Sequence, residues 1–555
     1  MNTGRFERYV LDGWRPILWI AAVVFLMYAR TIFFGFTYLD DKELLVNNYS
    51  FISNLSHIPQ AFTSRIFPHL PAPYYRPLLT VTLMVDSSIG GASAMAYHPT
   101  NILIHALASC MLFLLLARLG FNRLSSLFFS LFFAVHPALV QAVAWIPGRN
   151  DSLLAVFTLI SFVAFLNYLD KRKRADYLLH LLFYALALFT KETAVMIAVI
   201  CLLYARLIDK NGLPMRELKN FAAGWVVITA GWFIARQIAL QNNSLDVTID
   251  SLAGSFLVSS PAIIQYIGKA IFPFNLSVFP TIQDTAFIYG IAAAIIIFFA
   301  LWFSKEKRWP FIVFGLSWFL LFLSPSLLRP SAAAVLDFQE HRMYLPMVGI
   351  IIMLHEIDAI KRMSVKRTTL LSCAIALCIL AAINIRHTGN FANGVAYWEN
   401  ATATSSHSWL THFRKASMYS DKGMLDKAER EYLEAVKLDP TASPVYAGLG
   451  DLYMAKDMPK EAELNFKKAL ATCPLNYPCY IRLGSIYYKQ GRFAEAAVMW
   501  VAALKIVPDS TDLLKNMAIL CAEQKDYKAA LFYVERLRKL GVEPPAEFLK
   551  KIGAR

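Results

Sequence analysis

Long apolar runs alternate with short basic clusters over residues 1–386, and this pattern predicts a polytopic membrane domain. The first run, 16–36, is long enough to cross a bilayer and follows three arginines. It is too long for the core of a signal peptide and lacks a small-residue cleavage site. We therefore expect an uncleaved anchor with a cytoplasmic N-terminus, because basic residues favour that side.

The basic clusters between the later runs set the direction of each expected crossing. The runs expected to span are 16–36, 98–117, 124–145, 152–169, two within 177–208, 220–240, 285–303, 309–325, 344–360 and 368–385. The run 252–274 is expected to be re-entrant or interfacial, because a full crossing would place the basic clusters at 305–308 and 361–367 outside. The total of about eleven spans puts the chain after Arg386 outside the cytoplasm.

The C-terminal part shows a different period, in which alanines, aromatic residues and prolines recur at 34-residue steps. The three series are Ala428, Ala462, Ala496 and Ala530; Tyr432, Phe466 and Trp500; and Pro440, Pro474 and Pro508. This period is typical of tetratricopeptide repeats (TPRs), whose helix pairs stack into a solenoid. We expect an all-α chain: a membrane domain at 1–386, a linker at 387–408, four repeats starting near 409, 443, 477 and 511 within 409–542, and a tail at 543–555.

Composition agrees with a membrane protein and excludes other classes. The chain is 57% hydrophobic and only 17% charged, which does not suit a single water-soluble domain. The net charge of +15 falls in clusters between apolar runs, so we do not expect nucleic-acid binding. The seven cysteines show no metal-ligand spacing. Cys473 and Cys479 leave two alternatives: a small disulfide in an oxidising compartment, or packing of Cys479 as a small hydrophobic residue.

Two adjacent acids, Asp40 and Asp41, follow the first span and are the candidate catalytic residues. Two neighbouring carboxylates do not both ionise easily at low dielectric, so one keeps a raised pKa and can act as a base near neutral pH. The alternative is that the acids only mark the polar end of a span. Paired carboxylates can also hold a divalent cation, although no ligand set in the sequence demands a metal.

Other polar residues fall at the outer ends of the expected spans, almost all on the side of Asp40. The basic set expected to hold a phosphate is Arg76, Arg149, Lys191, His341 and Arg342. The other candidates for the same pocket are Tyr75, His98, His136, Glu192, Glu340 and Tyr344. Arginine suits bidentate phosphate contacts and lysine a point-charge contact, and the nearest anion in a membrane is a lipid phosphate. Each residue taken alone is equally well explained as an anchor at a helix end.

Six motifs in order, followed by the repeats, resemble the transmembrane-and-TPR O-mannosyltransferases and their bacterial relatives. The motifs are DDKELLVNN (40–48), YRPL (75–78), HPTNILIHA (98–106), AVHP (134–137) with GRND (148–151), KET (191–193) and EHRMYLP (340–346). The resemblance implies a bundle of the GT-C type and a lipid-phosphate sugar donor. It also implies transfer of a mannose-like sugar to a Ser or Thr hydroxyl on the extracytoplasmic face. It places the acid pair of the family on Asp40 and Asp41 and its Arg-Pro element on Arg76.

The resulting hypothesis is a membrane glycosyltransferase that uses a polyprenyl-phosphate sugar, inverts the anomeric configuration and binds its acceptor protein through the repeats. It would lie in a bacterial inner membrane, or in the endoplasmic reticulum of a eukaryote. Two alternatives stay open: a non-catalytic scaffold that displays TPRs for an export or pilus assembly, and a GT-C enzyme that acts on a lipid or polysaccharide. Concave helical repeats usually hold peptides, which favours a protein acceptor.

Overall fold

The computed structural model describes residues 6–67, 74–209, 212–240, 248–328 and 338–553. The chain divides into two compact units, Met1–Ser405 and Ser406–Arg555. Throughout the described residues the regular elements are helices, as the sequence predicts, and no β-strand occurs among them. The stretch 387–408, predicted as a linker, contains α20 (Gly394–Thr404), and the domain limits drawn from the sequence stay a prediction.

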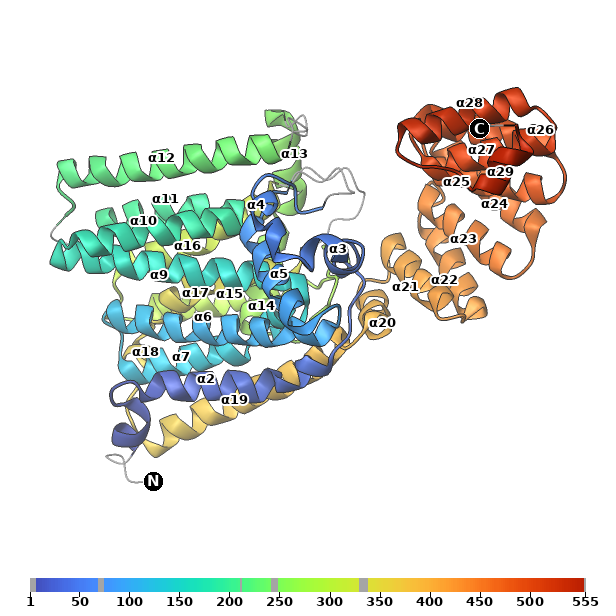
Figure 1. Ribbon diagram of the computed structural model, residues 1–555. Coiled ribbons are helices and arrows are strands. Elements are labelled where there is room, and N and C mark those ends of the chain that lie inside the picture. Colours follow the sequence, from blue (N-terminus) through green and yellow to red (C-terminus); the bar gives the residue numbers. More distant parts are fainter. Residues whose placement is uncertain (1–5, 68–73, 210–211, 241–247, 329–337, 554–555) are drawn as a thin grey trace. The chain divides into compact units, whose positions relative to one another are not determined.

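The first unit is a bundle of helices that run side by side (Figure 1). Its longer helices are α2 (Arg15–Tyr28), α5 (Pro77–Gly90), α6 (His98–Arg118), α7 (Arg123–Val135), α9 (Arg149–Lys171), α10 (Arg174–Thr190), α11 (Met196–Leu207), α12 (Met215–Leu240), α13 (Ile249–Ser259), α14 (Ala262–Ile271), α15 (Ile288–Phe303), α16 (Trp309–Leu327) and α19 (Arg367–Thr388). Shorter elements are α3 (Tyr49–Ile52), α4 (Ile58–Ala61), α8 (Gln141–Ala144), α17 (Pro346–Leu354), α18 (Asp358–Lys361), and the 3₁₀ turns η2 (Ala29–Phe33), η8 (Glu192–Val195) and η9 (Glu340–Met343).

Helix α9 lies at the centre of the first unit and packs against α6 and α10. Its Phe162 contacts Trp318 and Phe314 of α16, with ring centroids 5.4 and 5.9 Å apart. Helices α16 and α17 approach each other backbone to backbone: a Cβ on Gly315 would lie 2.6 Å from the carbonyl oxygen of Gly349. The core is therefore built around α9, whose first residues lie in the candidate site described below.

Among the residues of the first unit that the structure describes, six helices are long and apolar enough to cross a membrane, or seven if the bent pair Arg123–Val135 and Pro137–Ala144 is one span. The prediction of about eleven spans is not confirmed. Helices do occupy the predicted ranges, but α15 has only 16 residues and α17 only 9. At a rise of about 1.5 Å per residue, helices this short do not by themselves cover a hydrocarbon core of about 30 Å.

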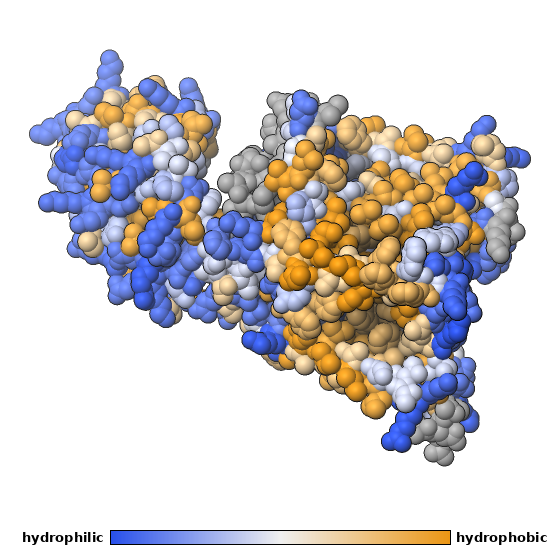
Figure 2. Space-filling view, turned by 180° about the vertical axis from the view of Figure 1, so that it is seen from behind, coloured by the Kyte–Doolittle hydropathy of each residue, from blue (hydrophilic) through white to orange (hydrophobic). Residues whose placement is uncertain are grey.

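The surface of the first unit agrees with a membrane environment. Figure 2 shows a broad hydrophobic area over this unit, whereas the second unit in the same view is mostly hydrophilic. The run predicted as re-entrant is divided near Pro261 into α13 and α14, of 11 and 10 residues. Helix α5, of 14 residues, was not expected from the sequence, because its apolar run is shorter than a membrane span.

Over residues 406–553 the second unit consists of four helix pairs and a final short helix. The pairs are α21 (Trp409–Asp421) with α22 (Leu425–Leu438), α23 (Ser443–Ala455) with α24 (Pro459–Thr472), α25 (Tyr477–Lys489) with α26 (Phe493–Ile506), and α27 (Thr511–Glu523) with α28 (Tyr527–Lys539), followed by α29 (Ala546–Lys551). The four predicted repeat starts are confirmed, because each first helix begins at its predicted residue. The recurring alanines are fully buried, and the aromatic residues fill the space beside them.

Cys473 and Cys479 are both free thiols in the structure. Cys479 is buried in a hydrophobic cluster with Phe466 and Leu483. Of the two alternatives drawn from the sequence, the structure therefore has the packed cysteine and not the disulfide.

Candidate active site

The acid pair lies in a tight turn after the first helix. Tyr38, two residues before Asp40, has φ +59°, a left-handed conformation that non-glycine residues seldom adopt. Asp41 closes the turn, because its Oδ2 accepts hydrogen bonds from the Thr37 backbone N at 2.6 Å and from Thr37 Oγ1 at 2.7 Å. Asp41 is buried and Asp40 is half-buried. The two acids therefore differ: Asp41 holds the turn, and Asp40 is the more accessible carboxylate.

Burial raises the pKa of Asp41 to about 6, while hydrogen bonds from Thr37 lower it and the charge of Asp40 raises it. The ordinary value is 3.8, so the folded protein binds this proton more tightly than the unfolded chain does. Stability contributed by the protonated group is therefore present below pH 4 and is lost as the pH rises to about 6. At about 1.4 kcal/mol per pH unit, the loss amounts to about 3 kcal/mol.

The variant Asp41→Asn tests this linkage, because its amide does not titrate. We expect the free energy of unfolding of the wild type to fall relative to that of the variant by about 3 kcal/mol between pH 4 and pH 7. Unfolding in detergent micelles, followed by circular dichroism at several pH values, measures both proteins. A difference between the two proteins that does not change with pH would contradict the raised pKa.

A second group of polar residues forms where α9 begins, in the motif Gly148–Asp151. Gly148 lies against the preceding turn: an added Cβ would be 2.3 Å from the carbonyl oxygen of Gln141. Only glycine allows this approach without displacing the start of α9. The three residues after Gly148 each contact a different part of the unit.

Replacing Gly148 by alanine is expected to lower the free energy of unfolding by about 1–3 kcal/mol, because the backbone must move to accept the methyl group. Gly231 in α12 is the matched control, since an added Cβ there meets no atom within 4 Å. Alanine at Gly231 should be neutral or slightly stabilising in a helix interior. Thermal unfolding in detergent measures both variants, and an equal melting temperature for the two would contradict the close approach.

Arg149 is fully buried and bound by the protein itself. Its Nη1 pairs with Asp86 Oδ2, its Nε donates to Asn101 Oδ1 at 2.6 Å, and its Nη2 donates to the Tyr97 carbonyl oxygen at 2.6 Å. The sequence predicts a phosphate contact for Arg149, but these contacts give it a structural role. They join α9 to α5 and to the start of α6. Asp86 and Asn101 are site residues that sequence reasoning missed, although Asp86, the only charged residue of α5, was a visible signal.

Asn150 and Asp151, the next two residues of α9, contact charged side chains from other segments. Asp151 Oδ1 accepts a hydrogen bond from Lys191 Nζ at 2.7 Å, and its Oδ2 lies 3.9 Å from Nε2 of His341. The hydrogen-bond network places the Asn150 amide oxygen 3.1 Å from Arg76 Nη1 and its nitrogen 2.9 Å from the Thr190 carbonyl oxygen. Asp151 appears in a recognised motif, but the sequence did not single it out.

Arg76 completes this cluster through Glu192, whose Oε1 lies 3.1 Å from Arg76 Nη2. The Arg76 side chain is 17% exposed and that of Glu192 is 40% exposed. The guanidinium also lies over the ring of Tyr74, 4.7 Å from its centroid. Polar side chains from four segments thus meet here. We call this group the charged cluster; it consists of Arg76, Asp151, Lys191, Glu192 and His341.

The acid turn and the charged cluster lie at the same end of the helices. The ring of His98, the first residue of α6, contacts Phe34 in the chain leading to the turn, with centroids 6.3 Å apart. The preceding residue, Tyr97, accepts the hydrogen bond from Arg149. The segment that follows the acids packs in one hydrophobic cluster with α5 and with Ile146, just before α9. The predicted convergence on one end is therefore present in the fold.

Several predicted pocket residues have structural partners instead of a place in the charged cluster. Tyr75 donates to the Phe62 carbonyl oxygen at 2.8 Å, and Tyr344 bonds to His105 Nδ1 at 2.6 Å. His136 lies 3.2 Å from the Ala270 carbonyl oxygen and accepts from the Ala138 backbone N at 3.3 Å, so it caps the turn after α7. Arg342 is half-buried in η9 beside His341.

Glu340 belongs to a separate buried cluster. It pairs with Lys269 of α14, accepts a hydrogen bond from the Ser277 backbone N at 2.9 Å, and has its Oε2 3.2 Å from His387 Nε2. Sequence reasoning missed Lys269 and His387 as partners of Glu340, although a lysine within an apolar run was a visible signal. Within the described residues, no group of three or more His, Cys, Asp or Glu side chains is arranged to hold a metal ion.

The chain is similar to known glycosyltransferases and repeat proteins. Residues 77–235 match the family model described as dolichyl-phosphate-mannose-protein mannosyltransferase, and residues 411–441 and 481–541 match tetratricopeptide repeat models. Protein O-mannosyl-transferase F38B6.6 of Caenorhabditis elegans is 23% identical over 458 residues, which cover 78% of this chain and 64% of the relative. Protein O-mannosyl-transferase Tmtc1 of Drosophila melanogaster is 27% identical over 33% of this chain and 21% of its own length.

Among solved structures, MamA is 19% identical, with a TM-score of 0.26, over 28% of this chain and 90% of MamA. The chain spans between 21% and 64% of the length of the two O-mannosyl-transferase relatives. The matched mannosyltransferase region, 77–235, begins one residue after Arg76 and contains the start of α9 and Lys191.

Proposed function

Because the chain is a relative of the transmembrane TPR O-mannosyltransferases, we propose that it transfers a mannose-like sugar from a polyprenyl phosphate to a Ser or Thr hydroxyl of a protein. The observation that carries this proposal is the arrangement of the first unit. An accessible carboxylate, Asp40, lies at the same end of the helices as the charged cluster, and three of the five residues of that cluster, Asp151, Lys191 and Glu192, lie within the matched region. The TPR unit would hold the acceptor protein.

In the proposed reaction the acceptor hydroxyl oxygen attacks the anomeric carbon of the sugar. The bond from that carbon to the phosphate oxygen breaks, and the polyprenyl phosphate leaves with the bonding electrons. The hydroxyl proton passes to the Asp40 carboxylate. Because the attack is a direct displacement, the anomeric configuration inverts. Asp41 is a positioning residue in this mechanism, since its carboxylate holds the turn through Thr37.

The charged cluster would hold the leaving phosphate, on which negative charge grows in the transition state. Arg76 is held in place by Asn150 and lies partly open beside the more exposed Glu192. An arriving phosphate would compete with Glu192 for the guanidinium, and the Glu192 side chain is 40% exposed. Lys191, which pairs with Asp151, would add further positive charge, and His341, on the other oxygen of Asp151, would add a ring nitrogen beside it. Arg149 is not part of this proposed phosphate site, because its donors are bound within the protein.

The proposed orientation puts the acid turn and the TPR unit on the extracytoplasmic face. A topology reporter fused after Arg386 is expected to read as extracytoplasmic, and one placed within 171–174 as cytoplasmic. The second fusion is the control, because its four basic residues fix that turn on the cytoplasmic side. A cytoplasmic signal after Arg386 would separate the repeats from the acid pair and contradict this orientation.

Comparison of exported proteins from cells with and without the gene tests the proposed function. Intact-mass measurement should show hexose-sized losses on particular proteins when the gene is deleted, and an active-site variant should fail to restore them. Unchanged masses together with a defect in a secreted assembly would favour a TPR scaffold. A change confined to a lipid or polysaccharide would favour a different acceptor.

A further inference from the structure

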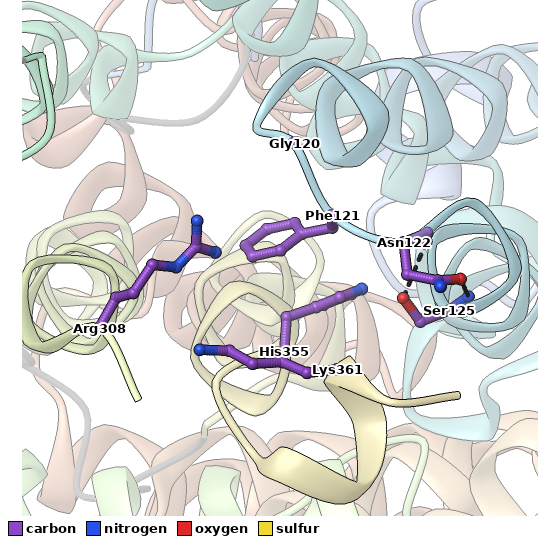
Figure 3. A pocket seen from close by; sticks show the side chains of 7 residues that line it. All are labelled: Gly120, Phe121, Asn122, Ser125, Arg308, His355 and Lys361. Atoms are coloured by element: carbon purple, nitrogen blue, oxygen red, sulfur yellow. Dashed lines mark hydrogen bonds between the residues drawn. The ribbon is translucent and has the colours of Figure 1, made fainter. Parts of the chain in front are cut away.

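A cavity of about 430 Å³, drawn from close by in Figure 3, lies beyond the C-terminal end of α6. It is lined by Gly120, Phe121, Asn122, Ser125, Arg308, His355 and Lys361. These residues come from the turn after α6, the first turn of α7, the residue before α16, the residue after α17, and α18. Since α6 begins at His98 near the acid turn and has 21 residues, about 30 Å separates the two ends. The cavity therefore belongs to a different face from the charged cluster.

Arg308 is held rigidly at this cavity. Its Nε and Nη2 donate to Glu356 Oε1 at 3.0 and 2.7 Å, and its backbone N donates to Glu356 Oε2 at 2.7 Å. The guanidinium also lies over the rings of Phe311 and Phe121, at 3.8 and 5.3 Å from their centroids. Its Nη1 has no hydrogen-bond partner among the residues described. One edge of a fixed guanidinium thus stays available to a ligand.

The charges around the cavity are arranged with the positive groups outward. Glu356 is fully buried and pairs with both Arg308 and Lys361, the latter at 2.6 Å. The side chains of Arg308 and Lys361 are 42% and 18% exposed. Two cations therefore face outward over one buried carboxylate, and the excess positive charge favours an anion. A fixed arginine edge beside an ammonium group suits a phosphate oxygen pair.

His355 determines a second property that a ligand of this cavity needs. Its Nδ1 lies 2.8 Å from the Ile351 carbonyl oxygen, so Nδ1 carries the hydrogen and Nε2 of the neutral ring is an acceptor. Nε2 is buried, and the described residues provide no partner for it. The ring stacks on Phe121 with centroids 4.3 Å apart, which fixes its direction in the cavity wall. A ligand that satisfies Nε2 must bring a hydrogen-bond donor such as a hydroxyl.

We propose that this cavity binds a phosphate ester that carries a free hydroxyl, with Arg308 and Lys361 on the phosphate and His355 on the hydroxyl. This chemistry is found in a glycerol phosphate, either as the headgroup of a membrane lipid or as a soluble molecule. Figure 3 shows the Arg308 and Lys361 side chains at one side of the cavity and the His355 ring beside Phe121. The site is independent of the proposed transferase reaction.

Binding to the full chain purified in detergent tests the proposal with defined probes. Short-chain phosphatidylglycerol has the phosphate and the hydroxyl, phosphatidylmethanol has the same charge without the hydroxyl, and sn-glycerol 3-phosphate has no lipid tail. We expect saturable binding of phosphatidylglycerol that is at least about tenfold tighter than that of phosphatidylmethanol. Tight binding of glycerol 3-phosphate would assign the site to the soluble ester, and binding of phosphatidylglycerol alone would assign it to the lipid. Equal affinity for phosphatidylglycerol and phosphatidylmethanol, or no binding of any probe, would overturn the proposal.

Two variants distinguish binding in this cavity from a general attraction of anionic lipids to the basic surface. Arg308→Gln/Glu356→Gln removes the guanidinium without leaving a buried carboxylate unpaired and without changing the net charge. It should weaken phosphatidylglycerol binding at least about tenfold, whereas His355→Phe should abolish the preference over phosphatidylmethanol. Lys307→Gln is the control, since its ammonium bonds to the Trp302 and Ser304 carbonyl oxygens and does not line the cavity. Unchanged binding by the double variant, in protein with wild-type circular dichroism, would contradict the site.

Discussion

Asp40→Asn is expected to lower the rate of sugar transfer by about a hundredfold or more, the scale of a lost general base. The amide has nearly the same size as the carboxylate, so the fold should be kept. Asp40 is half-buried, and the hydrogen bond from the Thr37 backbone N that closes the turn goes to Asp41 and not to Asp40. The loss should therefore appear in kcat with little change in the KM for the donor. Single-turnover transfer by the reconstituted protein measures it.

Glu43→Gln is the matched control for this prediction. It makes the same change from carboxylate to amide three residues further along the chain, where the side chain is also half-buried. Its transfer rate should stay within about threefold of the wild type, because a substitution away from the reacting atoms removes no proton acceptor. Equal losses in Asp40→Asn and Glu43→Gln would indicate damage to the loop and not to the chemistry.

Arg76→Gln is expected to lower kcat/KM for the polyprenyl-phosphate donor by about 10²–10³-fold, the cost of removing one group that stabilises charge in a transition state. The guanidinium lies beside Asn150 and Glu192 with part of its surface open. In this position the guanidinium would stabilise the negative charge that grows on the leaving phosphate. Initial rates over a range of donor concentrations measure the change.

The double variant Arg76→Gln/Glu192→Gln distinguishes a lost phosphate contact from an unpaired carboxylate. It removes the positive and the negative partner of the 3.1 Å ion pair together, so the local charge balance is kept. We expect its activity to stay as low as that of Arg76→Gln. Recovery of most of the activity in the double variant would mean that the single variant failed because Glu192 was left without its partner.

The repeat unit could be predicted from the sequence almost residue by residue. Each helix pair contacts mainly its neighbours, so a 34-residue period in Ala428 and its equivalents fixes both the packing positions and the start of every repeat. The membrane unit is different. Hydropathy located most of its helices but not α5. By itself it also could not show where a run divides, as at Pro261, because a turn inside an apolar run leaves the hydropathy unchanged.

The candidate site could be predicted only in part. The expected direction of each span placed the acid turn and Arg76 on one side of the membrane, and in the structure both lie at the same end of the helices. The partner of each charge was not visible, since Arg149 pairs with Asp86, 63 residues earlier in the chain, and Lys269 pairs with Glu340, 71 residues later. An arginine that binds a ligand and an arginine that joins two helices look the same in sequence. Only the contacts in the structure distinguish the role of Arg76 from that of Arg149.

Transfer by the purified protein in liposomes tests whether Asp40 assists a direct displacement at the anomeric carbon. Polyprenyl-phosphate mannose and a Ser/Thr peptide are supplied to the wild type and to Asp40→Asn, and the product is analysed by mass spectrometry and by NMR of the anomeric centre. We expect a hexose on a hydroxyl side chain with inverted configuration, formed by the wild type and nearly absent with Asp40→Asn. Equal product from both proteins, or retention of configuration, would contradict a direct displacement assisted by Asp40.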